Sequence, residues 1–194
     1  MNLSEAALPA KTSEAREKTV IVLAMHGEPP RDFPKDKFSV FFRLQTRLEF
    51  GEALGTELQD EFAALDSEMR RWPRTPENDP FYFGSQEMAQ DLSRLTGYQV
   101  ILGFNEFCAP HLDEAIDEAA ERKPEKIIII TPMMTPGGGH SEEDIPALVK
   151  EAQKRHPDVP IVYAWPFDPS KTAQFLAEQI DQVNDQMNEG LKRL

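Results

Sequence analysis

Short apolar runs recur along the chain and separate longer stretches in which apolar positions return every three or four residues. Each run is rich in β-branched residues and is continuously apolar rather than alternating. Such runs are typical of strands that are buried on both faces of a parallel sheet. They predict four strands, at residues 19–25, 98–104, 126–131 and 159–165.

The stretches between and after these runs predict amphipathic helices, because their apolar residues recur at spacings of three and four. One apolar stripe runs from Leu54 to Met69, and further helices are expected to begin near residues 85, 110, 141 and 170. Strands that alternate with helices imply right-handed crossovers. The expected fold class is therefore α/β: an open, mainly parallel four-stranded sheet with helices on both faces.

The interval between the first and second predicted strands is too long for a single crossover. A helical insertion of about two helices is therefore expected after the first strand, at about residues 31–79. Residues 1–18 show no clear apolar period and are expected to form a flexible leader. A chain of 194 residues fits one domain of ordinary size, so we expect residues 19–194 to form a single α/β domain.

Composition narrows the class of protein. The chain has 21 basic and 34 acidic residues, and its net charge of −13 argues against non-specific binding to nucleic acid or to an anionic membrane. Every purely apolar run, including residues 20–25 and 127–130, is far shorter than the roughly 20 residues that span a bilayer. No secretory signal is recognisable in the first eighteen residues, and the single cysteine, Cys108, suits a reducing compartment. We expect a cytoplasmic protein without nucleic-acid or membrane partners.

Chemically active side chains follow three of the predicted strands: His26 the first, Glu106 the second and His140 the third. Ligands of open α/β sheets bind beyond the carboxyl ends of the strands. Imidazole is a good ligand for divalent cobalt, nickel, iron and zinc, and it also exchanges protons near neutral pH. We expect the two histidines to bind a divalent metal ion, or all three side chains to accept protons.

Alternatively, either histidine is structural and Glu106 caps a helix. The other histidines, His111 and His156, are expected to be structural or solvated.

Three consecutive glycines, residues 137–139, lie immediately before His140. Glycine allows the backbone to approach a ligand closely, and the N-terminus of a following helix favours anions. Gly138 and Gly139 are therefore candidate ligand-binding positions. The run lacks the Gly-Lys-Ser/Thr ending of a phosphate loop, and the chain has no G-x-G-x-x-G fingerprint, so we expect no nucleotide cofactor.

Several motifs follow one another along the chain. The first strand ends in His26-Gly27, and the second leads into Phe104-Asn-Glu-Phe-Cys-Ala-Pro110. The third leads to Gly139-His140, which is followed by Glu143-Asp-Ile-Pro146. With the closing segment that ends in Pro166-Phe-Asp168, these motifs resemble the class II tetrapyrrole chelatases, specifically the CbiX/SirB type sirohydrochlorin chelatases. The resemblance covers residues 19–30 and about 98–185.

The resemblance implies ATP-independent insertion of a divalent metal ion into a sirohydrochlorin-type tetrapyrrole, with Co²⁺ favoured over Fe²⁺ or Ni²⁺ as the metal substrate. It implies that His26 and His140 are the paired active-site histidines and that Glu106 is the acidic residue. Longer relatives hold two such half-domains, so this chain is expected to form a homodimer. A metal or tetrapyrrole carrier without turnover, and a metal-independent protein with structural histidines, are the alternatives.

The insertion has no counterpart in the short members of that family. It carries side chains that suit a flat, apolar substrate edged with carboxylates. Arg31 and Arg43 are the candidate substrate-binding residues among its basic side chains, which also include Lys35, Lys37 and Arg47. Its aromatic side chains, which could form walls around the substrate or merely pack the inserted helices, are Phe38, Phe41, Phe42 and Phe50.

Overall fold

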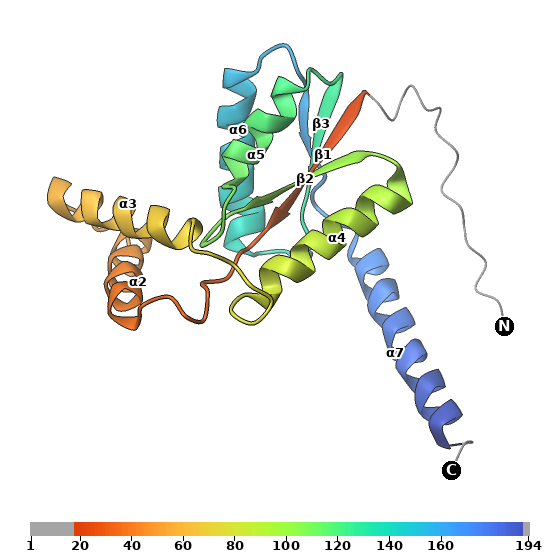
Figure 1. Cartoon of the computed structure of the whole chain (residues 1–194). Helices are drawn as coiled ribbons and strands as arrows, with labels where there is room; N and C mark the ends of the chain where they lie inside the picture. The colour runs from red at the N-terminus through yellow and green to blue at the C-terminus, as the bar shows by residue number, and fades with distance from the viewer. Residues whose placement is uncertain (1–17, 192–194) are drawn as a thin grey trace.

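The centre of the computed structural model, which describes residues 18–191, is a four-stranded sheet (Figure 1). The strand order is β2-β1-β3-β4, and every neighbouring pair is parallel. The strands are β1 (Thr19–Met25), β2 (Gln99–Phe104), β3 (Lys126–Ile130) and β4 (Ile161–Tyr163). The predicted α/β class with an open parallel sheet is confirmed. The expected leader, apart from residue 18, lies outside the described residues.

Within residues 18–191 the chain forms six α-helices and one short π-helical segment, η1 (His140–Asp144), which runs directly into a helix. The α-helices are α2 (Lys35–Glu49), α3 (Thr56–Arg70), α4 (Pro80–Thr96), α5 (Leu112–Glu121), α6 (Ile145–Arg155) and α7 (Pro169–Leu191). The first two lie where the sequence predicts an inserted pair of helices. None of the helices in this part of the chain is both long and apolar enough to cross a bilayer.

The start of α4 differs from the sequence-based expectation. Asp79 is the N-cap, and its side chain accepts a hydrogen bond from the backbone N–H of Tyr82 at 2.9 Å. The expected start near Ser85 is wrong, because this serine lies inside the helix and its hydroxyl donates to the carbonyl of Phe81. The helix ends at Gly97, whose positive φ of 70° favours glycine.

Alternating side chains of the strands build a core on each face of the sheet. On one face Val22, Ile127 and Ile129 pack with residues of α5 and α6. On the other face Leu23 and Phe104 pack with residues of α4 and of the insertion. Helices therefore lie on both faces, as the sequence predicts, and the inner strand β1 is buried along its whole length.

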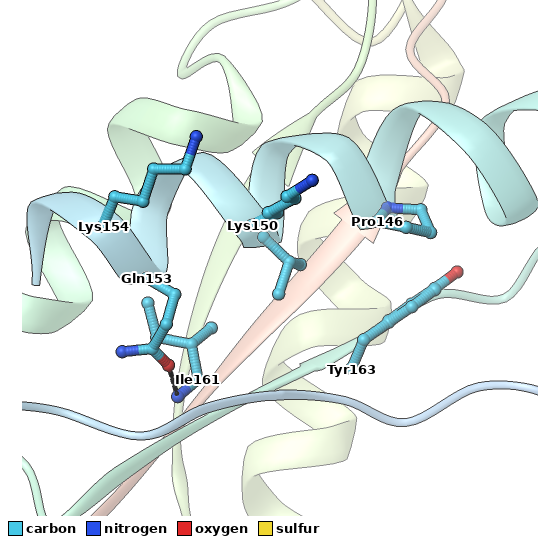
Figure 2. Close-up of a pocket in the computed structure, with 7 residues that line it drawn as sticks. Pro146, Lys150, Gln153, Lys154, Ile161 and Tyr163 are labelled. Atoms are coloured by element: carbon cyan, nitrogen blue, oxygen red, sulfur yellow. Dashed lines mark hydrogen bonds between the residues drawn. The ribbon is translucent and has the colours of Figure 1, made fainter. Parts of the chain in front are cut away.

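The outer edge of the sheet at β4 carries a pocket of about 490 Å³ between this strand and α6 (Figure 2). Gln153 of α6 reaches the edge, and its Oε1 accepts a hydrogen bond from the backbone N–H of Ile161 at 2.9 Å. The ring of Tyr163 lines the same pocket, and burial raises the pKa of Tyr163 to about 12.

Candidate metal centre

Three loops meet beyond the carboxyl ends of β1, β2 and β3. His26 follows β1 directly, Glu106 lies two residues beyond β2, and His140 begins η1 after the loop that follows β3. Because β1 lies between the other two strands in the sheet, the carboxyl ends of all three are neighbours. The topology therefore brings together side chains of which the first and the last are more than a hundred positions apart in the sequence.

The three side chains form a compact cluster of ligand atoms. One such atom from each of His26, Glu106 and His140 lies within 4.8 Å of the other two. Nε2 of His26 is 3.9 Å from Oε2 of Glu106, and the two imidazole rings meet edge to face with their centroids 4.6 Å apart. In protein sites for divalent metal ions such as Zn²⁺, nitrogen and oxygen ligands lie about 2 Å from the ion. Modest side-chain movements would therefore place all three atoms on one ion.

The hydrogen bonds of the two histidines leave one nitrogen of each ring free. Nδ1 of His26 is 2.7 Å from the carbonyl oxygen of Gly27. Nδ1 of His140 is 2.7 Å from Oδ2 of Asp144, one helical turn further along the chain. A carbonyl and a carboxylate can only accept, so Nδ1 is the donor in both contacts, and in a neutral imidazole Nε2 is then the atom that keeps its lone pair. Partners of this kind orient the imidazoles of metal sites and increase their basicity.

Glu106 is positioned by a residue from the insertion. Nε2 of Gln45, on α2, donates to Oε1 of Glu106 at 2.8 Å, which leaves Oε2 on the side of His26. The alternative that Glu106 caps a helix is wrong, because α5 begins with His111 as its N-cap. The expectation that His111 and His156 are structural agrees with their contacts: His111 caps α5, and Nε2 of His156 is 2.7 Å from Asp117.

Gly27 allows the first two loops to touch. The backbone N–H of Glu106 donates to the carbonyl of His26 at 2.8 Å, so the chains run close together. Gly27 has a φ of +97°, and a Cβ built on it would lie 1.9 Å from the carbonyl oxygen of Glu106. Any other residue would force these loops apart and separate the two ligands that they carry.

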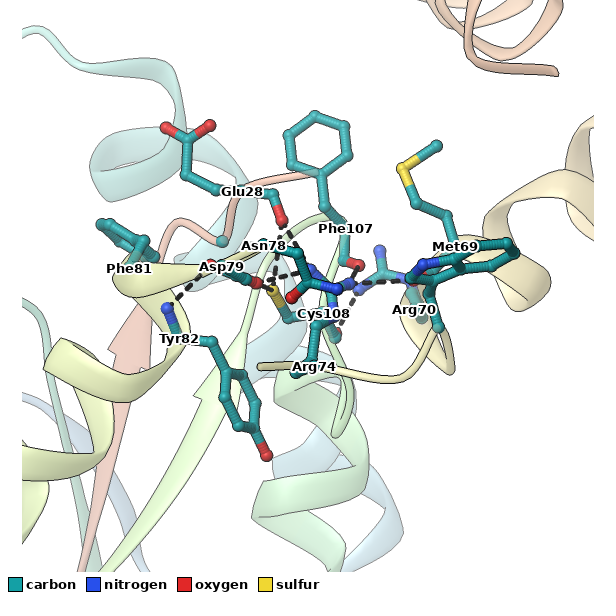
Figure 3. Close-up of polar contacts among 12 residues, drawn as sticks. Glu28, Met69, Arg70, Arg74, Asn78, Asp79, Phe81, Tyr82, Phe107 and Cys108 are labelled. Carbon is teal, nitrogen blue, oxygen red and sulfur yellow. Dashed lines mark hydrogen bonds and ion pairs between the residues drawn. The ribbon is translucent and has the colours of Figure 1, made fainter. Parts of the chain in front are cut away.

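A buried polar network holds the loop after β1 and the loop after β2 (Figure 3). Arg74 follows α3, pairs with Asp79, and donates to the carbonyl oxygens of Glu28 and Phe107. The side chains of Arg74 and Asp79 are only 7% and 1% exposed. Glu28 belongs to the loop of His26, and Phe107 follows Glu106, so one guanidinium holds both loops.

A second arginine of the insertion, Arg70, extends this support. It donates to the carbonyl oxygens of Asn105 at 3.0 Å and Cys108 at 3.1 Å, on either side of Glu106. Cys108 is completely buried, and burial raises the pKa of its thiol to about 11. A thiol held in its neutral form is a poor nucleophile, so its surroundings favour a structural role for Cys108.

The candidate substrate-binding arginines lie on the insertion, outside the cluster of three ligands. Arg31 is exposed and, with Lys35 and Phe38, lines a cavity of about 200 Å³ that begins at Pro29 and Pro30 in the loop after His26. Arg43 is exposed on α2. The structure does not assign a ligand to either side chain, and their roles stay predictions.

The remaining candidates are the glycines before η1 and the aromatic residues of the insertion, and they differ in exposure. Gly138 and Gly139 are exposed in the loop before η1, and a Cβ built on Gly139 would meet nothing within 4 Å, so their binding role stays a prediction. Phe41 is buried and stacks on Phe62 of α3 with ring centroids 5.0 Å apart. For Phe41 the packing alternative therefore holds, whereas Phe50 is 88% exposed.

Sequence comparisons connect the chain to known proteins. The CbiX family model matches residues 84–183, which are 100 of the 194 residues and include Glu106 and His140. A sirohydrochlorin cobaltochelatase of Priestia megaterium is 35% identical over 63 residues, which make up 32% of this chain. The match spans 20% of the length of that relative.

Two solved structures resemble the chain over longer stretches. A CbiX protein of Marinobacter aquaeolei VT8, provisionally assigned to cobalamin (vitamin B12) biosynthesis, is 16% identical, with a TM-score of 0.44 over 91% of this chain and 99% of that one. The sirohydrochlorin chelatase SirB of Bacillus subtilis subspecies spizizenii, in complex with cobalt, is 14% identical, with a TM-score of 0.39 over 77% of this chain and 43% of that one.

Proposed function

The chain belongs to the CbiX family, and from this premise we propose that it inserts a divalent metal ion into a sirohydrochlorin-type tetrapyrrole without ATP. One observation carries the proposal: His26, Glu106 and His140 converge from three strands, and both imidazoles keep Nε2 free. Because the matched stretch spans one fifth of the sirohydrochlorin cobaltochelatase, that protein's activity and substrate enter here as proposals.

In the proposed reaction, the ion first binds to Nε2 of His26, Nε2 of His140 and a carboxylate oxygen of Glu106. Two neutral imidazoles and one carboxylate leave a divalent ion with a net positive charge. Three protein ligands also leave coordination positions open, which the pyrrole nitrogens of the substrate need. The side chains of His26 and Glu106 are 40% and 23% exposed, so the ion and the macrocycle can reach them.

Transfer of the ion must be balanced by two protons, since the macrocycle loses two pyrrole N–H protons when the metal binds. As each pyrrole nitrogen replaces a protein ligand, that ligand regains a lone pair and can accept one of these protons. The metal thus moves to the macrocycle while two protons move to the cluster. Partial exposure allows the protons to pass on to solvent.

The insertion supplies the proposed contacts to the edge of the macrocycle. Arg31 and Lys35 line the cavity beside the loop of His26, and a guanidinium suits the carboxylates of such a substrate. Phe38 offers an apolar surface in the same cavity. Arg43, Gly138 and Gly139 are proposed as further contacts. Co²⁺ is proposed first as the metal, with Fe²⁺ and Ni²⁺ as alternatives, because imidazole and carboxylate suit all three ions.

The experiment that tests the proposal combines metal binding with turnover. Co²⁺ binding is measured by calorimetry, and metal insertion into metal-free sirohydrochlorin is followed by absorbance, with Fe²⁺, Ni²⁺ and other metal-free tetrapyrroles as comparisons. The double variant His26→Ala/His140→Ala is expected to lose both Co²⁺ binding and turnover. The matched control is His111→Ala/His156→Ala, which removes two histidines that lie outside the cluster and should keep both.

Each outcome separates the candidate functions. Binding that depends on His26 and His140 without any turnover identifies a carrier of metal or tetrapyrrole. Absence of Co²⁺ binding in the wild type identifies a metal-independent protein with structural histidines. If the double variant inserts metal as fast as the wild type, the assignment of these two residues is wrong.

A further inference from the structure

The pocket between β4 and α6 lies apart from the candidate metal centre. Its volume of about 490 Å³ is in the range of sites that bind small organic molecules. Seven residues line it, five on α6 and two on β4, and His26, Glu106 and His140 are not among them (Figure 2). The proposed metal insertion therefore does not explain the side chains that gather here.

One wall of the pocket is a side of α6. Pro146, Lys150 and Lys154 follow one another at spacings of four, so they lie in a row along the helix. Val149 adds an apolar side chain next to this row. Both lysines are exposed, and their ammonium groups can stay in water while their stems cover the apolar lining. This wall is therefore apolar at its base and cationic at its rim.

The other wall of the pocket is the outer strand of the sheet. Ile161 and Tyr163 are alternate residues of β4, so their side chains point to the same face, the one that carries α6. Ile161 is buried. The ring of Trp165 stacks on that of Tyr163, with centroids 6.1 Å apart and an angle of 10° between the ring planes. A ligand therefore meets an aliphatic side chain and a supported aromatic ring on this side.

The hydroxyl of Tyr163 is a donor without a use in the described chain. Its oxygen is buried, and it has no hydrogen-bond partner within residues 18–191. Burial raises the pKa of Tyr163 to about 12, so the hydroxyl keeps its proton at neutral pH. Burying a hydroxyl without a hydrogen bond is costly, and buried polar groups in folded proteins nearly always have a partner. This donor therefore points to an acceptor from outside the chain.

The remaining polar side chains of the lining are either used or cationic. Gln153 is used completely, because its Oε1 accepts from the backbone N–H of Ile161 and its Nε2 donates to two backbone carbonyls. Nζ of Lys154 is 2.6 Å from Oε1 of Glu151 at the exposed rim. Lys150 forms no salt bridge in the part of the chain that the structure describes. The side chains of the pocket thus offer donors and positive charge, and none of them is a carboxylate.

We propose that this pocket binds a small organic anion with an apolar body, such as an aromatic carboxylate. The acidic group lies at the ammonium groups of Lys150 and Lys154, and one of its oxygens accepts from the hydroxyl of Tyr163. The body packs against Val149 and Ile161. In a chain of net charge −13, two cations and no carboxylate around an apolar pocket select anions locally. The proposal does not depend on the proposed function, and its failure would leave the metal centre untouched.

A series of three probes tests the chemical class of the ligand. Naphthoate has an apolar body and a carboxylate, naphthamide is its neutral counterpart, and acetate is an anion without the body. Each is titrated into the full chain, and binding is located by NMR from the backbone amide signals. Naphthoate is expected to shift the signals of Val149, Ile161 and Tyr163 and to leave those of Gly27 and Glu106 in place. It should bind at least about tenfold more tightly than either comparison.

Two double substitutions test the cations. Lys150→Ala/Lys154→Ala should raise the dissociation constant of naphthoate at least about tenfold, because both ammonium groups are lost. Lys126→Ala/Lys171→Ala is the matched control. It removes the same charge from two exposed positions outside the pocket and should change the constant less than about twofold. Equal effects of the two variants would contradict the proposal.

Tyr163→Phe tests the buried donor, because it removes only the hydroxyl. The dissociation constant of naphthoate should rise about three- to tenfold. The protein should remain folded, since the lost group has no partner in the described chain. An unchanged constant would show that the hydroxyl does not meet the ligand and would overturn the proposal.

The probe series can also overturn the proposal on its own. Equal binding of naphthoate and naphthamide shows adsorption to an apolar surface without recognition of charge. Equal binding of naphthoate and acetate shows attraction to exposed cations only. Shifts confined to the loops of Gly27 and Glu106 place the anion at the metal centre. No shift with any probe shows that the pocket does not bind this class of ligand.

Discussion

The candidate metal centre and the Arg74–Asp79 network lie on the same pair of loops, yet they differ in exposure and in how many of their polar atoms form hydrogen bonds. In the centre, Nε2 of both histidines is free and the side chain of His26 is 40% exposed. In the network, the Arg74 guanidinium contacts a carboxylate and several backbone carbonyls, and Asp79 is 1% exposed. The first cluster therefore keeps nitrogen atoms that are free to bind an ion, whereas the Nη1 and Nη2 groups of Arg74 are used to hold the loops.

The difference teaches that the candidate ligands lie on loops whose positions depend on groups outside the cluster. Removing a member of the centre leaves atoms that solvent can satisfy. Removing a member of the network leaves a buried charge, which costs much more. The effects of substitutions should therefore separate along this line: loss of stability for the network and loss of metal affinity for the centre.

The largest effect is expected from Asp79→Ala. It leaves the buried Arg74 without its carboxylate and removes the N-cap of α4, so the free energy of unfolding should fall by about 3–5 kcal/mol. Urea denaturation measures the change. The matched control is Asp91→Ala, which removes the exposed partner of Arg94 and should cost no more than about 1 kcal/mol. Equal costs for both variants would remove the distinction between the two clusters.

Gly27→Ala tests the contact between the two ligand-bearing loops. The new Cβ would lie 1.9 Å from the carbonyl of Glu106 at a positive φ, so Co²⁺ affinity should fall at least about tenfold and stability by about 1–3 kcal/mol. Gly51→Ala is the control, since Gly51 also has a positive φ of 75° but nothing within 4 Å of the built Cβ. It should lose some stability and keep its Co²⁺ affinity. If both variants bind Co²⁺ as the wild type does, the loop contact does not position the ligands.

Asp144→Asn sharpens the comparison within the centre. The amide cannot match the carboxylate as a partner of Nδ1 of His140, so Co²⁺ affinity should fall by about 10- to 100-fold with little change in stability. Calorimetric titration with Co²⁺ measures it. Glu143→Gln removes the same charge from the neighbouring exposed position and should have a much smaller effect. Equal losses would mean that Asp144 acts only through its charge.

The smallest expected effect is a dependence of the free energy of unfolding on pH, which arises from Cys108 beside the network. Burial raises the pKa of Cys108 from 9.0 to about 11, so between these values the unfolded chain releases the thiol proton while the folded chain keeps it. The stabilisation by Cys108 is complete below pH 9 and is lost as pH rises toward 11, by about 1 kcal/mol at pH 10. Comparing urea denaturation of the wild type and of Cys108→Ala from pH 8 to 10.5 isolates this contribution. Parallel pH profiles would contradict the prediction.

The sequence predicts the sheet and the meeting of its loops because both depend on strong local signals. Continuous apolar runs mark buried parallel strands, and residues after neighbouring strands must share an edge. His26, Glu106 and His140 could be selected on this basis alone. Asp144 could also be predicted as the partner of His140, because it follows His140 by four positions in a helical segment.

The supporting network could not be predicted, for a physical reason. Arg70 and Arg74 contact backbone carbonyls, and a carbonyl is present at every residue, so no side chain marks the partner in the sequence. The start of α4 was misplaced because Ser85 and Asp79 are both good N-caps. Asp79 is the N-cap in the structure, and it also pairs with Arg74. This tertiary contact cannot be predicted from the local sequence pattern.

The contact of Gln153 with Ile161 affects how copies of this chain can associate. The end strand of an open sheet offers unpaired amide groups that can template a foreign strand and start fibril growth. Here that strand is only three residues long, and an amide oxygen from the neighbouring helix already occupies one of its N–H groups. Strand-by-strand polymerisation is therefore blocked at this margin, and self-association is directed to side-chain surfaces.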